Sequence, residues 1–400
     1  MKLQHKEIKK ALRKEQWVNP FTLGKYSVAP YRACQHGCKY CDGRAEKYYI
    51  EGDFETDIIV RSNLPQLLAL ELPKVKERGI VSFGSGVTDV YQPSEGKEGL
   101  MRQCAELLAM HPFPVSVLTK SSLILRDLDL WEKVHHKNGF ILMVSLTFLD
   151  DEMRQIFEPH ASSVKERLEM IAEFKKRGMH VGVLAMPFIP FLTDHSAHLA
   201  ALMQKLTELK VDFMMPGGLT LRPGRQKELF LDTVRGRLPH LLPHIERLYQ
   251  EDRPSGNPLP SYSRELSARF HEVAKAYAIP PALPHAIYRN MMPLQDELYI
   301  LLSHMIDLYA RRGISVSPLQ QSFKRYAAWL LEAKRVHSRK SRQHVQEAND
   351  RIDESIVQGE LESILQNRKL HRFIMEVAAE RKVFNYLSLK LENKSIEDLK

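Results

Sequence analysis

The feature that most constrains the fold is a series of short β-rich runs alternating with longer amphipathic segments between residues 20 and 222. The runs start about 30–50 residues apart, with most gaps near 35, a spacing typical of repeated βα units that build a parallel sheet. Six such units predict an α/β fold, a partial (β/α)6 TIM-type barrel whose chemistry lies at the carboxyl ends of the strands. The runs are Tyr26–Tyr31, Ile80–Phe83, Val115–Thr119, Ile141–Thr147, His180–Met186 and Phe213–Leu221.

Helical segments fall between these runs, at Leu64–Lys76, Leu100–Met110 and Val164–Arg177. The last has an apolar stripe at helical spacing and Gly178 as its stop. After residue 225 the strand signals fade. We expect a basic N-terminal helix over 1–18, the barrel over 19–225, a helical continuation of the core over 226–290, and an all-helical C-terminal module over 291–400.

Composition and charge limit the classes of partner that the chain could have. Hydrophobic residues make up 44% of the 400 residues, enough for a sizeable core. The formal net charge is +9, and residues 1–50 alone carry 11 Lys/Arg and 4 Asp/Glu. A second basic stretch is Phe323–His344. Such stretches suit nucleic acid, acidic protein or anionic lipid. They equally suit a solvated face on which long side-chain stems pack.

The four cysteines point to a reducing compartment, because three of them lie within eight positions, as in a metal site rather than a disulfide framework. The chain contains no run of about 18 apolar residues that could span a membrane. No secretory signal follows Met1. We therefore expect a cytoplasmic protein that does not enter a membrane.

The cysteine cluster is Cys34, Cys38 and Cys41, directly after the first β-rich run, with Gly37 allowing a tight loop. A cubane of four irons usually takes four cysteines, so three leave one iron open, as catalytic metal sites do. Zinc, with His36 or Cys104 as a fourth ligand, and a purely structural cluster are the alternatives. Cys104 lies on an apolar helical stripe and suits a core position.

The pattern Cys-x3-Cys-x2-Cys, with the aromatic Tyr40 before the last cysteine, resembles the signature of the radical S-adenosylmethionine (SAM) superfamily. The resemblance implies a [4Fe–4S] cluster whose open iron chelates SAM. It further implies a partial barrel of the radical SAM kind, and cleavage of SAM to a 5′-deoxyadenosyl radical. The electron would come from an external one-electron reductant that is flavodoxin- or ferredoxin-like.

Several further segments resemble the subfamily around spore photoproduct lyase, called DNA repair photolyase-like. The resemblance covers roughly residues 19–285 and leaves out the helical module. Its segments are Asn19-Pro20, the cysteine loop, Asp57–Arg61, Ser85–Glu95, Leu118–Asp127, Pro187–Pro190 and Thr193-Asp194.

This resemblance implies a set of SAM contacts. The backbone of Tyr40 and that of Ala185 would meet the adenine, Ser85 and Gly86 the methionyl amino group, and Ser145 the ribose. Lys120 would pair with the SAM carboxylate through a charge-assisted bond. Each has a plainer explanation: Lys120 could be a solvated lysine, and Ser145 a satisfied strand hydroxyl.

The chain also departs from the pattern. Ser85-Gly86 replaces a Gly-Thr pair, and Val90 replaces a proline. The lyase uses a cysteine near the end of the second strand as hydrogen donor, whereas Val81–Gly86 contains none, so lesion reversal by that route is not implied. Tyr91 could relay a hydrogen atom instead. Asp89, Tyr91 and Glu95 are therefore candidates for the substrate side, or for loop structure.

Three functions remain open from the sequence. The first is a radical SAM enzyme that abstracts hydrogen from an unknown substrate, with nucleic acid favoured by the basic stretches. The second is the same enzyme acting on a peptide or small molecule. The third is a non-catalytic, metal-stabilised nucleic-acid-binding protein. The sequence sets neither the substrate nor the oligomeric state.

Overall fold

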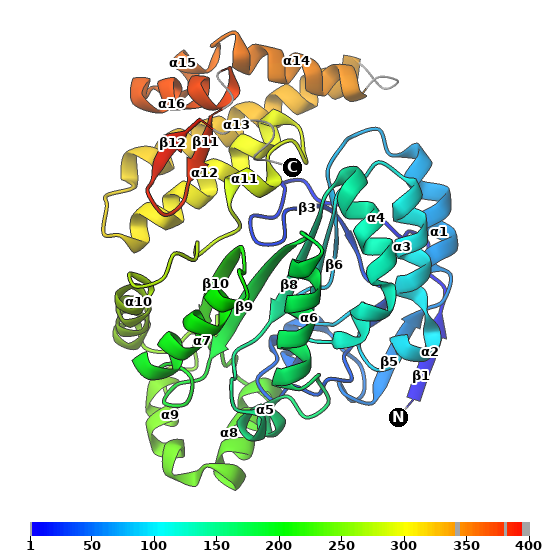
Figure 1. Ribbon diagram of the computed structural model, residues 1–400, viewed down its shortest axis with the longest axis vertical. Helices are drawn as coiled ribbons and strands as arrows, with labels where there is room; N and C mark the ends of the chain where they lie inside the picture. Colours follow the sequence, from blue (N-terminus) through cyan, green and yellow to red (C-terminus); the bar gives the residue numbers. More distant parts are fainter. Residues whose placement is uncertain (1, 341–344, 380–381, 394–400) are drawn as a thin grey trace. The chain divides into compact units, whose positions relative to one another are not determined.

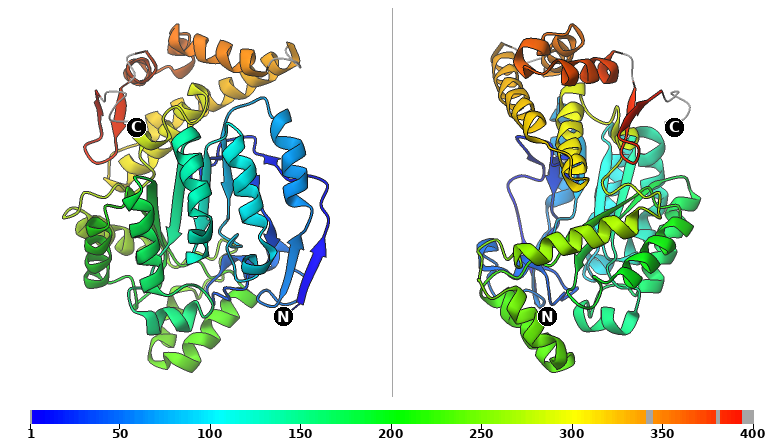
Figure 2. Two further views of the ribbon diagram at one scale, coloured as in Figure 1. Left: turned by 45° about the vertical axis from the view of Figure 1, so that its right-hand side comes forward. Right: turned by 90° about the vertical axis from the view of Figure 1, so that its left-hand side faces the viewer.

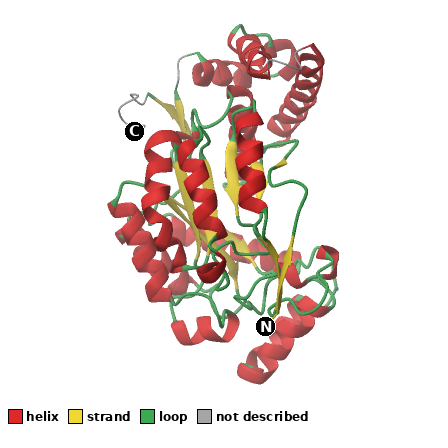
Figure 3. Cartoon of the chain, turned by 90° about the vertical axis from the view of Figure 1, so that its right-hand side faces the viewer, coloured by secondary structure: helices red, strands yellow, loops and turns green. Residues whose placement is uncertain are grey.

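The computed structural model describes residues 2–340, 345–379 and 382–393. The described residues form helices and strands joined by loops (Figure 3). Strands and helices alternate between residues 57 and 237, and helices predominate after that. The chain divides into two compact units, and each unit draws on separate stretches. No helix of the described residues is both long and apolar enough to cross a membrane. The first unit contains Met1–Leu12, Val28–Leu70 and Phe83–Ile279, and the second contains Arg13–Ser27, Glu71–Ser82 and Pro280–Lys400.

The first unit is built on parallel strands that lie side by side in chain order (Figure 1). They are β7 (Val115–Thr119), β8 (Phe140–Ser145), β9 (His180–Phe188) and β10 (Phe213–Gly218), and their buried patterns explain their apolar sequences. Of β6 (Ile80–Phe83), residues 80–82 are assigned to the second unit and Phe83 to the first. The predicted parallel α/β architecture is confirmed, and the described strands form no closed barrel.

Helices connect these strands as the sequence predicts. α4 (Leu128–Asn138) packs on β7 and β8, and α6 (Val164–Lys176) packs on β9 (Figure 1). α6 begins with a capping box between Ser163 and Glu166, and Gly178 follows it with φ of +72°. The other helices before residue 279 are α1 (Leu64–Glu71), α2 (Glu95–Glu98), α3 (Leu100–Met110), α5 (Asp151–Phe157), α7 (Ser196–Glu208), α8 (Arg225–Arg237), α9 (Leu242–Leu248) and α10 (Pro260–Ala274).

The predicted N-terminal helix over 1–18 is wrong. Residues Lys2–Lys6 form strand β1, which pairs in parallel with β5 (Asp57–Arg61), and β4 (Tyr31–Arg32) pairs on the other side of β5. β2 (Arg13–Lys14) pairs with β3 (Gly24–Val28). Backbone bonds to a partner more than 50 residues away outweigh the local helical periodicity, which is a weak determinant by itself.

The second unit holds a helical region with one added hairpin (Figure 2). The hairpin of β11 (Val383–Asn385) and β12 (Lys390–Glu392) corrects the prediction of an all-helical module. It forms because Phe384 and Tyr386 are buried among the helices. The helices are α11 (His285–Tyr288), α12 (Leu294–Arg311), α13 (Ser317–Lys340), α14 (Val345–Val357), α15 (Leu361–Leu365) and α16 (Arg368–Ala378).

A buried ion-pair network holds the separate stretches of this second unit together. Lys25 is only 2% exposed and lies 3.5 Å from the Glu77 carboxylate and 3.7 Å from that of Asp296. Lys334 of α13 pairs with Asp296 at 2.6 Å. Buried charges persist in proteins when they are paired in this way.

Several cations of α13 have partners within the protein. Besides Lys334, Arg325 donates to the Leu365 carbonyl at 3.2 Å, and Arg335 pairs with Glu332. The stretch was predicted as Phe323–His344, and residues 341–344 lie outside the described residues.

Candidate active site

The three-cysteine loop follows β4 and has a fixed backbone. Cys34 and Cys38 are buried, and Cys41 is partly exposed. The Cys34 amide donates to the Phe54 carbonyl at 3.1 Å, and the Cys41 amide donates to the Cys38 carbonyl at 3.3 Å. Gly37 has φ of +66°, and a Cβ atom there would stand 2.8 Å from the Glu55 carboxylate. Glycine, which has no Cβ atom, suits that position.

The chemistry of this loop fits an iron–sulfur cluster. All three thiols are free, and burial raises the pKa of Cys38 to about 12 while Lys120 opposes that rise. Among the described residues, no three Cys, His, Asp or Glu side chains converge on one point as a single metal ion requires. A cubane takes one thiolate on each iron, so its ligands stand farther apart than ligands around one ion. Three free thiols in one loop fit a [4Fe–4S] cluster that keeps one iron open.

Both proposed fourth ligands for zinc are engaged elsewhere. His36 is 2% exposed, with Nδ1 3.1 Å from the His160 carbonyl and Nε2 3.2 Å from the Asp89 carboxylate. Cys104 is fully buried on α3 among core residues. Neither His36 nor Cys104 is therefore free to complete a zinc site with the three cysteines.

Lys120 stands at the end of β7 between two groups of the site. Its ammonium lies 5.9 Å from the centre of the Tyr40 ring and 3.9 Å from the Glu158 carboxylate. Glu158 also accepts the Tyr40 hydroxyl and pairs with Arg167. Burial alone would raise the pKa of Glu158, but Arg167 and Lys120 hold that pKa below its ordinary value. Glu158 is therefore a carboxylate, surrounded by two cations and a phenol.

The remaining predicted SAM contacts lie at strand ends of the same sheet. The register pairs Thr119 with Val144 and Ser145 with Leu184, so Lys120, Ser145 and Ala185 reach one edge. Ser85 and Gly86 follow β6 in a turn closed by a Ser85–Thr88 bridge, and the Gly86 carbonyl lies 3.9 Å from the Cys41 thiol.

The three residues considered for the substrate side instead have structural partners. The Asp89 carboxylate accepts the Lys120 amide at 2.7 Å and the Thr119 hydroxyl at 2.8 Å. Tyr91 is fully buried, and its hydroxyl donates to Asp127 and accepts the Trp131 indole N–H. Glu95 is also fully buried and binds the Tyr31 hydroxyl (2.5 Å) and Arg126 (2.6 Å). These contacts favour a role for the three residues in holding the loop structure rather than in contacting substrate.

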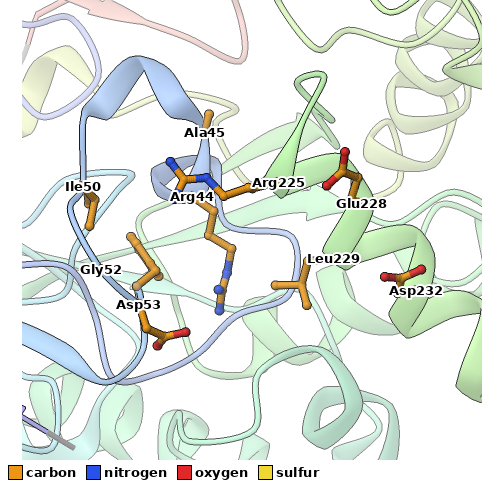
Figure 4. A pocket seen from close by; sticks show the side chains of 10 residues that line it. Arg44, Ala45, Ile50, Gly52, Asp53, Arg225, Glu228, Leu229 and Asp232 are labelled. Carbon is orange, nitrogen blue, oxygen red and sulfur yellow. The ribbon is translucent and has the colours of Figure 1, made fainter.

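A cavity of about 330 Å³ adjoins the cysteine loop on another side (Figure 4). Its wall includes Arg44, whose Nε donates to the Cys38 carbonyl at 2.9 Å and whose guanidinium lies over the Phe54 ring. On the opposite wall are Arg225, Glu228 and Leu229 of α8. No residue predicted to contact SAM lines this cavity.

Sequence reasoning missed Glu158 and Arg167. Glu158 directly follows α5, and Arg167 lies within α6, so neither belongs to a motif. The one usable signal was an Arg on the face of a helix predicted to pack on the sheet, because buried charges need a partner.

A parallel βα fold with a three-cysteine loop at its strand ends defines an α/β protein with an iron–sulfur site. The family model of the radical SAM superfamily matches residues 28–203. An uncharacterized protein of Mycobacterium tuberculosis is 31% identical over 285 residues, which cover 69% of this chain and 82% of that protein. An uncharacterized protein of Methanocaldococcus jannaschii is 29% identical over 180 residues, covering 44% and 66% respectively.

Solved structures show the same fold. Spore photoproduct lyase complexed with dinucleoside spore photoproduct has a TM-score of 0.50 at 13% identity, and the match covers 69% of this chain and 79% of that one. The chain belongs to the radical SAM superfamily. It is a radical SAM enzyme, and the superfamily uses a [4Fe–4S] cluster, SAM and an external electron donor.

Proposed function

We propose that Cys34, Cys38 and Cys41 hold the [4Fe–4S] cluster and that SAM lies along the adjacent strand ends. One observation carries this assignment: the ammonium of Lys120, at the end of β7, lies 5.9 Å from the ring of Tyr40, which stands between the second and third cysteines. A cation at that position is suited to the SAM carboxylate.

The other contacts follow from the shared edge of the sheet. Ser145 is assigned to the ribose, and the backbone of Ala185 and of Tyr40 to the adenine. Ser85 and Gly86 are assigned to the methionyl amino group; a Cβ atom on Gly86 would meet nothing within 4 Å, so the backbone there is open to a ligand. When bound, the reduced cluster supplies the electron that splits SAM and gives a 5′-deoxyadenosyl radical.

Asp89, Tyr91 and Glu95 are assigned to positioning rather than to contact with substrate. Asp89 supports this because its carboxylate fixes the amide of Lys120 at 2.7 Å. Tyr91 and Glu95 support it because both are fully buried within polar networks. The external reductant is assigned to the flavodoxin- or ferredoxin-like class.

For the substrate we propose nucleic acid. Lys2, Lys6, Lys9 and Lys10 are all exposed on or after the edge strand β1 and would meet a polyanion. The competing explanation is that edge lysines only prevent strand-to-strand association. The fold shared with an enzyme solved with a dinucleoside photoproduct agrees with the first explanation. A peptide or small molecule remains the second candidate.

Two experiments test these assignments. Anaerobic protein reconstituted with iron and sulfide is reduced, and its EPR spectrum is recorded with and without SAM while 5′-deoxyadenosine is assayed. A [4Fe–4S]⁺ signal that SAM changes supports the site, and a signal indifferent to SAM contradicts it.

For the substrate, binding of single- and double-stranded DNA and RNA is measured against salt. Affinity that falls steeply with salt, and weakens when the four lysines become glutamine, supports nucleic acid. Absent or salt-independent binding favours a peptide or small molecule.

A further inference from the structure

A buried group of charged side chains joins the cysteine loop to the ends of two strands. The side chain of Arg167 is fully buried, that of Glu158 is 1% exposed, and that of Lys120 is 16% exposed. Arg167 pairs with Glu158 and donates to the Ser145 carbonyl at 3.0 Å. One ion-paired unit therefore contacts both β7 and β8 where they end.

The same carboxylate reaches the cysteine loop. The Tyr40 hydroxyl donates to Glu158, and the neighbouring Lys39 amide donates to the Phe157 carbonyl at 2.8 Å. The end of α5 is thus bound to two consecutive residues of the loop. A displacement of Glu158 would change the contacts of both Tyr40 and Lys120.

The charges of this unit are unequal. Lys120 and Arg167 are cations and Glu158 is an anion, so the unit keeps one positive charge at the strand ends. Without Arg167, Glu158 would cancel the attraction of Lys120 for an anionic ligand. Without Glu158, the Lys120 ammonium would stand on a flexible stem of four carbons, and ordering it would cost entropy when the ligand binds.

We propose that Glu158, neutralised by Arg167, is a positioning residue that holds the Lys120 ammonium ready for the SAM carboxylate. The inference rests on the proposed function, because it takes the carboxylate of SAM as the ligand of Lys120. It adds a buried ion pair, outside the cysteine motif and the strand ends, to the residues that determine SAM affinity.

The experiment is a double-mutant cycle on SAM affinity with Glu158→Gln and Lys120→Met. The dissociation constant of SAM is measured by equilibrium dialysis on cluster-loaded protein. Glutamine keeps the size of the side chain and an acceptor for Tyr40 or Arg167, but it removes the charge that faces Lys120. We expect Glu158→Gln to weaken SAM binding about tenfold when Lys120 is present and less than about twofold when it is methionine.

Two further measurements separate positioning from a general loss of structure. Affinity for 5′-methylthioadenosine, which lacks the amino-acid end of SAM, should not change in Glu158→Gln. Glu158→Asp, which keeps the charge but draws it back by one methylene, should weaken SAM binding less than Glu158→Gln does. If Glu158→Gln does not fold, the aspartate variant carries the cycle.

Asp194→Asn is the matched control. Asp194 is likewise a buried carboxylate that accepts a tyrosine hydroxyl, from Tyr262 at 2.8 Å, and contacts an arginine, Arg269 at 3.4 Å. Asp194→Asn should lower stability. Any change that it causes in the dissociation constant of SAM should be the same with and without Lys120.

Equal weakening by Glu158→Gln with and without Lys120 would overturn the inference. If Lys120→Met alone left SAM binding unchanged, the proposed function itself would be wrong, so the two failures are distinguishable.

Discussion

Replacing Tyr91 by phenylalanine tests whether this residue serves the fold or relays a hydrogen atom. Its hydroxyl makes two buried hydrogen bonds, donating to Asp127 at 3.1 Å and accepting the Trp131 indole N–H at 2.8 Å. Both partners are fully buried. The variant keeps the ring and removes only the oxygen, so packing is preserved while the two bonds disappear.

The expected cost follows from those bonds. Each buried hydrogen bond contributes about 1 kcal/mol net, and an unsatisfied buried donor costs about 1–3 kcal/mol. The Trp131 N–H loses its acceptor in the variant, whereas Asp127 keeps Arg126 as a partner at 2.7 Å. We therefore expect Tyr91→Phe to lower the free energy of unfolding by about 2–4 kcal/mol.

The assay compares stability with chemistry in one sample. Urea unfolding gives the change in stability, and 5′-deoxyadenosine formed per cluster gives the activity of the folded fraction. Tyr262→Phe removes a single buried bond, to Asp194, and should cost about 1–2 kcal/mol. Unchanged stability of Tyr91→Phe together with lost 5′-deoxyadenosine formation would refute the structural role and return Tyr91 to the candidates for chemistry.

Three further changes are expected to give distinct results. Alanine at Cys34, Cys38 or Cys41 should abolish bound iron per chain, whereas Cys104→Ala should keep it, because Cys104 packs in the core; iron retained in the first three would contradict the ligand set. Lys25→Met should lower the free energy of unfolding by about 3 kcal/mol, since it leaves the buried carboxylates of Glu77 and Asp296 with one cation fewer to pair with. An unchanged midpoint of urea unfolding would argue against the network. Burial raises the pKa of Asp353 to about 6, so its carboxyl binds a proton more tightly in the folded state. The stabilisation from this bound proton is complete below about pH 4 and is lost as pH rises through 6. The free energy of unfolding of Asp353→Asn, relative to that of the parent protein, should therefore increase by up to ~3 kcal/mol between pH 4 and 7. A constant difference across that range would disprove the shifted pKa.

The repeated βα pattern could be predicted from sequence because its elements are held by local features. Ile80–Phe83, Val115–Thr119 and Leu100–Met110 have the predicted bounds. Short apolar runs bounded by polar turns are too short for helices, and amphipathic segments between them favour buried strands. The cysteine loop was found because metal ligands at close spacing leave a visible motif.

Pairing between distant segments could not be predicted in this way. β1 is charged and short, and only its partner β5 makes it a strand. β5 itself alternates, with Ile58 and Val60 buried, but five residues with only two buried side chains give a faint signal. The predicted SAM contacts were placed by resemblance, whereas Glu158 and Arg167 needed coordinates, because their roles arise from contacts between elements.

The second unit is built from three separate stretches of the chain, and this affects when it can form during synthesis. Residues 13–27 and 71–82 are made first, and the helices that they pack with begin about 200 residues later. At about 5–20 residues per second, the ribosome needs roughly 10–40 s to cover that distance. Over that interval Lys25 and Glu77 have neither Asp296 nor Lys334 as a partner. The second unit is therefore completed last in translation, and its early stretches must be kept from mispairing until then.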